Sequence, residues 1–235
     1  MDAFLMIGQS NMAGRGELTD VAPIENPLCH MLRMGRWIGM AEPINPDRDV
    51  FSSKFRSGIS LAASFADSYA NAYRRNVGLI PCAYGGTRIS EWMPGEVLFD
   101  HAVMQAKLAM RSSQLKGILW HQGESDCTNP ADFENYEQML VTMFAELRKE
   151  LGMPEVPIVM GEISELTGEQ WHMEGRNLEF NRRLRVTAEA IPGCAVALAK
   201  GLTLKDDGLH FNAVSCRKFG LRYFEAYQSL MTCMR

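Results

Sequence analysis

The feature that most restricts the fold of this chain is a repeated alternation of short apolar runs with amphipathic segments. Short runs closed by glycine or polar residues are typical of buried parallel strands, and apolar residues at steps of three and four are typical of helices. The predicted strands are 3–7, 77–83, 117–120, 156–160 and 195–199, and the predicted helices are 60–73, 97–110, 130–151, 178–190 and 213–230. We therefore expect an α/β fold with a five-stranded parallel sheet and helices on both faces.

One segment departs from this alternation. Residues 27–50 match neither a buried strand nor an amphipathic helix, and we expect them to form a hairpin-like insertion or a long loop near the first strand. No internal repeat, low-complexity tract or linker divides the chain. A length of 235 residues suits one large domain, so residues 1–235 are expected to form a single domain.

Composition excludes several classes of protein. The net charge of −4 and the lack of a Lys/Arg-rich run disfavour a nucleic-acid partner. No apolar stretch approaches the roughly 18–20 residues of a membrane span, and the first residues lack the basic region of a signal peptide. We expect a cytoplasmic protein with no membrane partner, or a secreted one if a leader has been removed. The six cysteines lie far apart without a C-x-x-C pair, so we expect free thiols, no metal site and no cofactor.

Polar, glycine-rich segments follow four of the five predicted strands. They are residues 8–14, 84–88, 121–126 and 206–212. In an open parallel sheet, ligands bind beyond the carboxyl ends of the strands. These four segments are therefore expected to meet at one rim of the sheet and to form the functional site.

The rim segments contain the groups needed for acyl transfer. Ser10 follows a buried strand directly, and a serine becomes a nucleophile when a base lies within hydrogen-bond reach. His210 is the candidate base, and Asp207, three residues earlier, can fold back to hold one imidazole nitrogen. Taken singly, Ser10 could be only a helix cap, and Asp207 only a turn residue beside a surface histidine.

A tetrahedral intermediate also needs hydrogen-bond donors for its oxyanion. The candidates are the backbone N–H groups of Ser10 and Gly86 and the side-chain amide of Gln122. The alternative for Gly86 is a tight connection between strand and helix, and the alternative for the third segment is ordinary core.

Four ordered segments resemble the signature blocks of the SGNH hydrolase superfamily. They read IGQSNMAG at 7–14, YGGTRISEW at 84–92, WHQGESD at 120–126 and DGLH at 207–210. This variant is similar to the sialic-acid-specific acetylesterase domain and to the acetylxylan esterases of carbohydrate esterase family 6. The third segment carries Gln where the superfamily has Asn.

The resemblance implies a flavodoxin-like three-layer α/β/α fold and a carbohydrate O-acetylesterase. It makes Ser10 the nucleophile and His210 the base, with Gly86 and Gln122 joining the Ser10 N–H as oxyanion donors. Asp207 matches the general position of the acid. Glu124 is the alternative acid in this branch, and we favour Asp207 because its closeness in sequence makes the geometry easy. Glu124 would then position the loop or a substrate hydroxyl instead.

The same blocks suggest how the substrate is held. Gln9, Arg88 and Trp92 are expected to bind it, because Arg suits a carboxylate and Trp offers a flat face to a sugar. An Arg–carboxylate contact would suit sialic acid, whereas acetylated xylan is neutral. Alternatively, Arg88 forms a surface ion pair with Glu91 or Glu96.

The expected reaction is removal of O-acetyl groups from a small sugar or an oligosaccharide of the sialic acid or xylo-oligosaccharide type, through an acetyl-enzyme. One alternative is a general short-acyl esterase or thioesterase of the same fold. Another is a catalytically inactive carbohydrate-binding domain, which the presence of Ser10, Asp207 and His210 disfavours. The sequence does not predict the oligomeric state.

Overall fold

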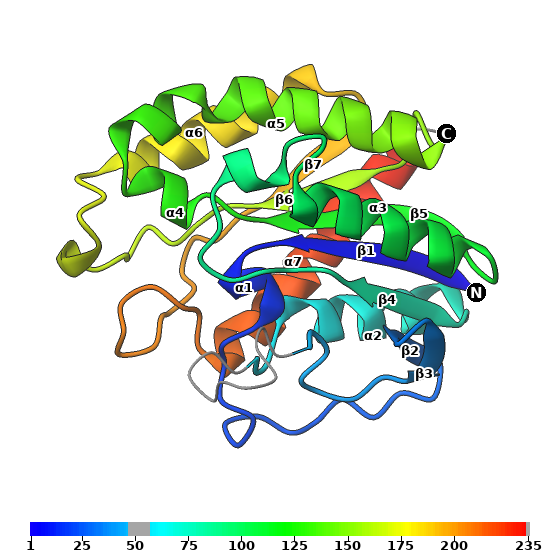
Figure 1. Cartoon of the computed structure of the whole chain (residues 1–235). Helices are drawn as coiled ribbons and strands as arrows, with labels where there is room; N and C mark the ends of the chain where they lie inside the picture. The colour runs from blue at the N-terminus through cyan, green and yellow to red at the C-terminus, as the bar shows by residue number, and fades with distance from the viewer. Residues whose placement is uncertain (47–56, 234–235) are drawn as a thin grey trace.

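The computed structural model describes residues 1–46 and 57–233, and within these ranges one seven-stranded sheet lies between two layers of helices (Figure 1). The strand order is β3-β2-β4-β1-β5-β6-β7, with β3 antiparallel to β2 and all other neighbours parallel. The strands are β1 (Asp2–Gly8), β2 (Cys29–Arg33), β3 (Arg36–Gly39), β4 (Val77–Pro81), β5 (Gln114–His121), β6 (Ile158–Gly161) and β7 (Cys194–Ala197). The predicted three-layer α/β/α class is confirmed.

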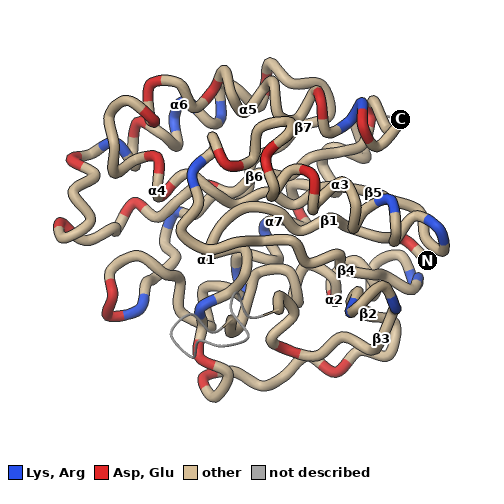
Figure 2. Tube along the Cα trace, viewed as in Figure 1, with Lys and Arg blue, Asp and Glu red and all other residues tan. Residues whose placement is uncertain are grey.

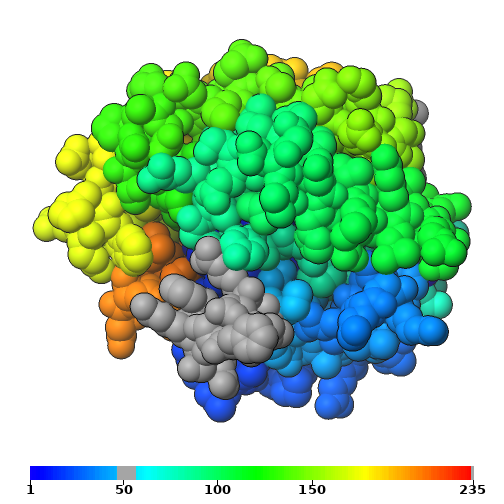
Figure 3. Space-filling model, in the orientation of Figure 1, coloured from blue at the N-terminus to red at the C-terminus, as the bar shows by residue number. Residues whose placement is uncertain are grey.

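The long helices divide between the two faces of the sheet. Helices α2 (Leu61–Tyr73) and α7 (Ala213–Cys233) cover one face, and α3 (Val97–Met110), α5 (Pro130–Leu151) and α6 (Arg176–Ala190) cover the other. In the space-filling view, the green side chains of α3 and α5 close over their face (Figure 3). Short helices follow the carboxyl ends of strands: α1 (Ser10–Ala13), η1 (Ile89–Trp92), α4 (Glu124–Cys127) and η2 (Glu169–Trp171).

Strand β1 lies at the centre of the sheet, between β4 and β5, and all seven of its residues are buried. Its side chains alternate between the two helical layers, because successive residues of a strand point to opposite faces. Ala3, Leu5 and Ile7 pack on the α3 and α5 side, whereas Phe4 and Met6 pack on the α2 and α7 side. Burial on both faces explains why this strand is a continuous apolar run rather than an alternating one.

The predicted count of five strands is wrong, because residues 29–39 add two strands at one edge. β2 pairs in parallel with β4, and β3 folds back antiparallel onto β2, so this part of the 27–50 segment is a hairpin. Residues 47–50 of that segment lie outside the described residues. Edge strands need only partial burial, and β3 has no buried residue. Their mixed polar and apolar sequence therefore does not have the pattern of a buried parallel strand.

Charges of both signs are interspersed on the surface of α5 and α6 (Figure 2). Arg183 of α6 lies 3.4 Å from Glu134 and 3.5 Å from Glu137 of α5, and Arg182 pairs with Glu179 within α6. Within the described ranges, no helix combines the length and apolarity needed to cross a bilayer. All six cysteines are free thiols, as expected from their spacing.

Helix α7 packs closely against α2 at Gly220. A Cβ atom added to Gly220 would lie 2.0 Å from the Leu61 carbonyl oxygen and 2.1 Å from the Ser64 hydroxyl. The first of these atoms belongs to the backbone and cannot rotate away. Glycine here therefore sets the distance between the two helices that cover one face of the sheet.

We expect Gly220→Ala to destabilise the fold by roughly 1–3 kcal/mol, because overpacking outweighs the gain of about 1 kcal/mol in helix propensity. Urea denaturation measures the change. The exposed Gln228 of the same helix supplies the control, because Gln228→Ala should change stability by at most about 0.5 kcal/mol. Equal stability of Gly220→Ala and the wild type would contradict the close approach.

Candidate active site

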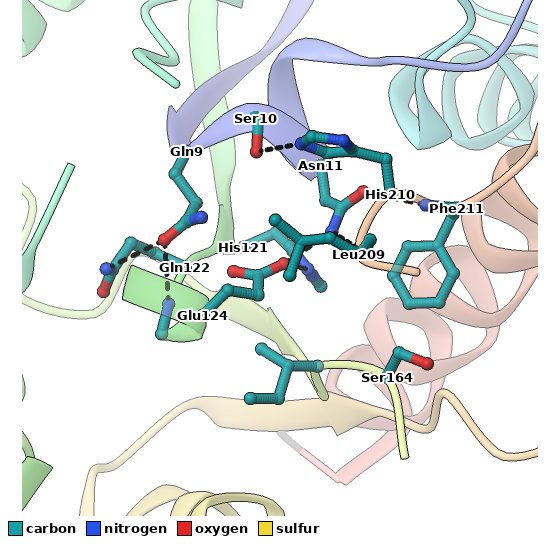
Figure 4. Close-up of polar contacts among 12 residues, drawn as sticks. Gln9, Ser10, Asn11, His121, Gln122, Glu124, Ser164, Leu209, His210 and Phe211 are labelled. Atoms are coloured by element: carbon teal, nitrogen blue, oxygen red, sulfur yellow. Dashed lines mark hydrogen bonds and ion pairs between the residues drawn. The ribbon is translucent and has the colours of Figure 1, made fainter. Parts of the chain in front are cut away.

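Three side chains form a hydrogen-bonded chain at the carboxyl ends of the strands. His210 Nε2 lies 2.9 Å from Ser10 Oγ, and His210 Nδ1 lies 2.8 Å from Asp207 Oδ2 (Figure 4 draws the contact of Ser10 with His210). The structure thus brings together a hydroxyl, an imidazole and a carboxylate that are separated by up to 200 residues in sequence. This is the geometry by which a carboxylate orients a histidine that takes the proton of a serine.

Ser10 reaches this position because β1 and β5 stay in contact to their last residues. Gly8 is paired with His121, and the Gln9 N–H donates to the His121 carbonyl over 2.8 Å. A Cβ atom on Gly8 would lie 2.0 Å from that carbonyl oxygen, and its φ of +123° disfavours any other residue. The close passage places Ser10, the first residue of α1, over the end of the sheet.

The histidine is held by a short loop before α7. The His210 carbonyl accepts the Lys205 N–H at 2.8 Å, and Asp207 Oδ1 accepts the N–H groups of Leu209 and His210, each at 2.9 Å. Burial raises the pKa of the Asp207 carboxyl, but the hydrogen bonds from His210 and Leu209 outweigh it and leave the pKa below its ordinary value. Asp207 is therefore ionised at neutral pH and can stabilise an imidazolium.

Glu124 takes no part in this chain, which corrects its proposed role as the alternative acid. Its Oε1 accepts a hydrogen bond from Asn11 Nδ2 at 2.5 Å and lies 3.1 Å from His121 Nε2. Asn11 also bonds the loop on either side of His210, at the Leu209 carbonyl and the Phe211 N–H. Burial raises the Glu124 pKa, but His121 and Asn11 outweigh it and lower the pKa overall. Glu124 thus supports the histidine loop through Asn11.

A cavity of about 380 Å³ opens beside Ser10 and His210, within the size range of small-molecule sites. It brings together residues from all four predicted rim segments. Its lining includes Gln9, Ser10, Arg15, Gly85, Gly86, Arg88, Glu124, Ser125, Thr128, Trp171, Leu209 and His210.

Three candidate donors belong to residues that line the cavity next to Ser10. The backbone N–H groups of Ser10 and Gly86 donate to no other described residue, and both residues line the cavity. Gln9 also lines it, and its carboxamide oxygen is turned inward, where it accepts the Gln122 Nε2 at 3.1 Å. The Gln9 nitrogen therefore lies on the side toward Ser10 (Figure 4). Donors in such positions can bind the oxyanion of a tetrahedral intermediate.

Gln122, which the sequence suggests as an oxyanion donor, does not face the cavity. It is not among the residues that line the cavity, and its amide nitrogen donates to the Thr87 carbonyl at 2.8 Å and to a carboxylate oxygen of Asp126. Donation to an oxyanion would break these bonds. The side-chain donor at the cavity is Gln9, which belongs to the first signature block rather than to the third.

Of the two other predicted substrate-binding residues, Arg88 lines the cavity and Trp92 does not. Arg88 is 49% exposed at its side chain and lies 3.3 Å from Asp132, so its ion-pair partner is neither Glu91 nor Glu96. Trp92 is only 1% exposed, because its ring packs edge-on against Trp120 in the core. The expectation that Trp92 offers a face to a sugar is therefore wrong.

Sequence reasoning missed several site residues, among them Arg15 in the lining of the cavity and the two described next, Asn11 and Trp171. Asn11 lies inside the first signature block, next to Ser10, so the sequence did contain a signal for it. Trp171 lies in η2, far from any block, and its indole N–H donates to the Asp207 carbonyl at 2.9 Å while the residue lines the cavity. No local pattern distinguishes it from the other tryptophans. Among the described residues, no group of three His, Cys, Asp or Glu side chains is placed to hold a metal ion.

Comparison with known proteins gives one family match. The family described as "Carbohydrate esterase, sialic acid-specific acetylesterase" matches residues 1–229. A curated relative, a probable carbohydrate esterase of Arabidopsis thaliana, is 30% identical over an alignment of 245 residues with its gaps. The alignment covers 96% of this chain and 90% of the relative. The crystal structure of that Arabidopsis protein superposes with a TM-score of 0.84 at 29% identity, covering 97% of this chain and 98% of the other.

More distant structures share the fold. NanS superposes with a TM-score of 0.74 at 16% identity, covering 98% of this chain and 97% of that one. A carbohydrate acetylesterase from Xanthomonas citri superposes with a TM-score of 0.65 at 17% identity. The match covers 99% of this chain and 56% of the Xanthomonas chain. At these identities, the likeness concerns the arrangement of the sheet and helices alone.

The two carboxylates near the site should differ in their effect on ester hydrolysis. Asp207→Asn removes the charge that holds His210 Nδ1, so we expect kcat to fall by about 10²–10⁴-fold. Glu124→Gln keeps an oxygen for Asn11 and leaves the triad intact, so its loss should be at least tenfold smaller. Steady-state kinetics on an activated acetyl ester measure both. A larger loss in Glu124→Gln would contradict the role given to Asp207.

The buried Asp126 carboxyl should make stability depend on pH in a definite direction. Burial raises its pKa from 3.8 to about 6, although hydrogen bonds from Gln122 and the Ile89 N–H partly offset this. Between these pH values the folded state binds more protons than the unfolded state, so this group's contribution to stability falls as the pH rises. The wild-type free energy of unfolding, relative to that of Asp126→Asn, should fall by roughly 2–3 kcal/mol between about pH 3.5 and about pH 6.5. A difference independent of pH would contradict the prediction.

Proposed function

Since the chain belongs to the carbohydrate esterase family of sialic acid-specific acetylesterases, we propose that it is a serine esterase that removes O-acetyl groups from a carbohydrate. The observation that best supports the serine mechanism is the unbroken chain from Ser10 Oγ through His210 to Asp207 at the wall of the cavity. These three groups have the order and spacing that acyl transfer through a serine nucleophile requires.

In the first half of the reaction, Ser10 Oγ attacks the acetyl carbonyl carbon while His210 Nε2 takes the hydroxyl proton. Asp207 keeps the Nδ1 proton in place and stabilises the imidazolium that forms. The oxyanion is bound by the N–H groups of Ser10 and Gly86 and by the Gln9 amide nitrogen, each of which faces the cavity. His210 then gives its proton to the sugar oxygen as the C–O bond breaks, leaving an acetyl-enzyme.

The second half repeats the same steps with water. His210 takes a proton from a water molecule, which attacks the acetyl carbonyl, and the same three donors bind the oxyanion. The Ser10 ester bond breaks, His210 gives its proton to Ser10 Oγ, and acetic acid leaves and ionises to acetate in solution. Every group acts twice, so the mechanism needs no further proton carrier.

The charges of the cavity favour an acidic sugar as the substrate. Arg15 and Arg88 both contribute to its lining, and a guanidinium matches a carboxylate with two parallel hydrogen bonds. Acetylated xylo-oligosaccharides are neutral and carry no carboxylate to pair with these cations. The proposed substrate is therefore an O-acetylated sugar acid of the sialic acid type, held with its acetyl group at Ser10.

Ser10→Ala tests the proposed reaction. Acetate release from O-acetylated sialic acid should fall by roughly 10⁴–10⁶-fold, because the nucleophile is lost and only the oxyanion donors and substrate binding remain. A coupled acetate assay measures it, with acetylated xylo-oligosaccharides and longer-acyl esters as comparison substrates. We expect the acetylated sugar acid to have the highest kcat/KM of the three.

The control is Ser229→Ala, because Ser229 is exposed on α7, outside the lining of the cavity, and its hydroxyl donates to the Glu225 carbonyl. This variant should keep wild-type turnover. Undiminished acetate release by Ser10→Ala would overturn the serine mechanism. A higher kcat/KM for the longer-acyl esters would instead favour a general esterase or thioesterase and reject the acetylesterase.

A further inference from the structure

The orientation of the Gln9 carboxamide is fixed by what its oxygen accepts. Gln9 Oε1 lies 3.1 Å from Gln122 Nε2, 3.4 Å from the Gly123 N–H and 3.3 Å from the Ser125 N–H. All three are donors, so only the oxygen end of the carboxamide fits there. The nitrogen end must face the opposite way, toward Ser10 (Figure 4).

Gln122 is oriented in turn by acceptors only. Its Nε2 faces Gln9 Oε1, the Thr87 carbonyl oxygen and Asp126 Oδ2. Its Oε1 is buried and has no hydrogen-bond partner among the described residues. An unpaired buried oxygen is unfavourable, so a strong interaction must hold the nitrogen end in place. A hydrogen bond to a carboxylate is the strongest of the three.

Asp126 is the group that can supply this interaction, and it has an unusual environment for a carboxylate. It is fully buried, and no Lys or Arg of the described residues forms an ion pair with it. Its Oδ1 accepts the Ile89 N–H at 3.0 Å, and its Oδ2 accepts from Gln122. Burial without a cation disfavours the charged form, which agrees with the raised pKa described above. Stability alone therefore gives no reason for a carboxylate at this position.

We propose that Asp126 is a positioning residue for the oxyanion hole, because through Gln122 it holds the amide nitrogen of Gln9 toward Ser10. It acts through two hydrogen-bonded amides and touches neither the cavity nor Ser10. The proposal rests on the proposed function, since it assumes that the hydroxyl of Ser10 attacks a carbonyl or an equivalent centre.

The isosteric change Asp126→Asn separates this role from simple structural support. The introduced carboxamide can keep its oxygen for the Ile89 N–H, so the segment that carries Gly86 remains anchored. Its NH₂ group then meets Gln122 Nε2, and two donors face each other. Gln122 is driven to turn its oxygen toward this NH₂ group, which brings that oxygen against Gln9 Oε1 and weakens the hold on Gln9.

The test is a double-mutant cycle of Asp126→Asn with Gln9→Ala, read by the rate at which a fluorophosphonate probe labels Ser10. In this reaction the Ser10 Oγ–P bond forms, the P–F bond breaks, fluoride leaves and His210 takes the proton. The phosphoryl oxygen occupies the oxyanion position, so the rate reports the donors without needing a natural substrate. Loss of one oxyanion donor typically costs about 10²–10³-fold.

We expect Gln9→Ala to slow labelling about 10²-fold and Asp126→Asn to slow it about 10–10²-fold. In the Gln9→Ala background, Asp126→Asn should have less than about a threefold further effect, because its partner is already gone. Multiplicative losses in the double variant would overturn the proposal, since a merely structural role does not depend on Gln9. If Asp126→Asn does not fold, Gln122→Met takes its place in the cycle with the same expectation.

Asp2→Asn is the matched control. Asp2 is another buried carboxylate, bonded to the Tyr69 hydroxyl at 2.8 Å near the opposite end of β1. The labelling rate of this variant should stay within about twofold of the wild type. If the losses in labelling rate are non-additive but no acetylated sugar releases acetate, the proposed substrate is rejected and the positioning role stands. A wild-type chain that the probe does not label would overturn the positioning role itself.

Discussion

The site depends first on the pairing of β1 with β5 up to the last residue of each strand. Gly8 still lies against His121 where the strands end, and the Gln9 N–H closes the contact. This contact between the ends of β1 and β5 places the first and third rim segments side by side. Ser10, Gln9 and Asn11 then face residues 121–126 at fixed distances, and the remaining rim segments need only complete an arrangement whose centre is already rigid.

Beneath the reacting groups lie two buried carboxylates with separate tasks. Glu124 holds Asn11, and Asn11 bonds both neighbours of His210, so this carboxylate supports the proton carrier. Asp126 holds Gln122 and the Ile89 N–H, so its contacts lie on the side of the oxyanion donors. The two residues are separated by one position in sequence yet act on different parts of the site, because α4 turns their side chains in different directions. The site is thus supported by polar groups that the hydrophobic effect alone would exclude from the interior.

Sequence reasoning succeeded where one local pattern has one physical meaning. Short buried runs such as 3–7, closed by glycine, are typical of central parallel strands, and Asp207 three residues before His210 could fold back on it with little constraint. It failed where the outcome depends on distant neighbours. The partly buried β2 takes its place from β4, whose paired residues lie 48 positions later, and the exposed β3 takes its place from β2. Trp92 became core because Trp120 packs against it, and Gln122 turned from the cavity because Asp126 binds its nitrogen. Neither contact changes the spacing of the residues within the signature blocks, so the sequence pattern does not reveal it.

The separation of Ser10 and His210 by 200 residues has a consequence for the chain as it is made. Synthesis produces the nucleophile well before the base, which follows only after the seven strands of the sheet have been translated. A nascent chain on the ribosome therefore carries an unactivated hydroxyl until residue 210 has emerged and its loop has docked. The chain would therefore gain hydrolytic activity in one late step, when the His210 loop docks. Activity thus reports that these distant segments have reached their native arrangement.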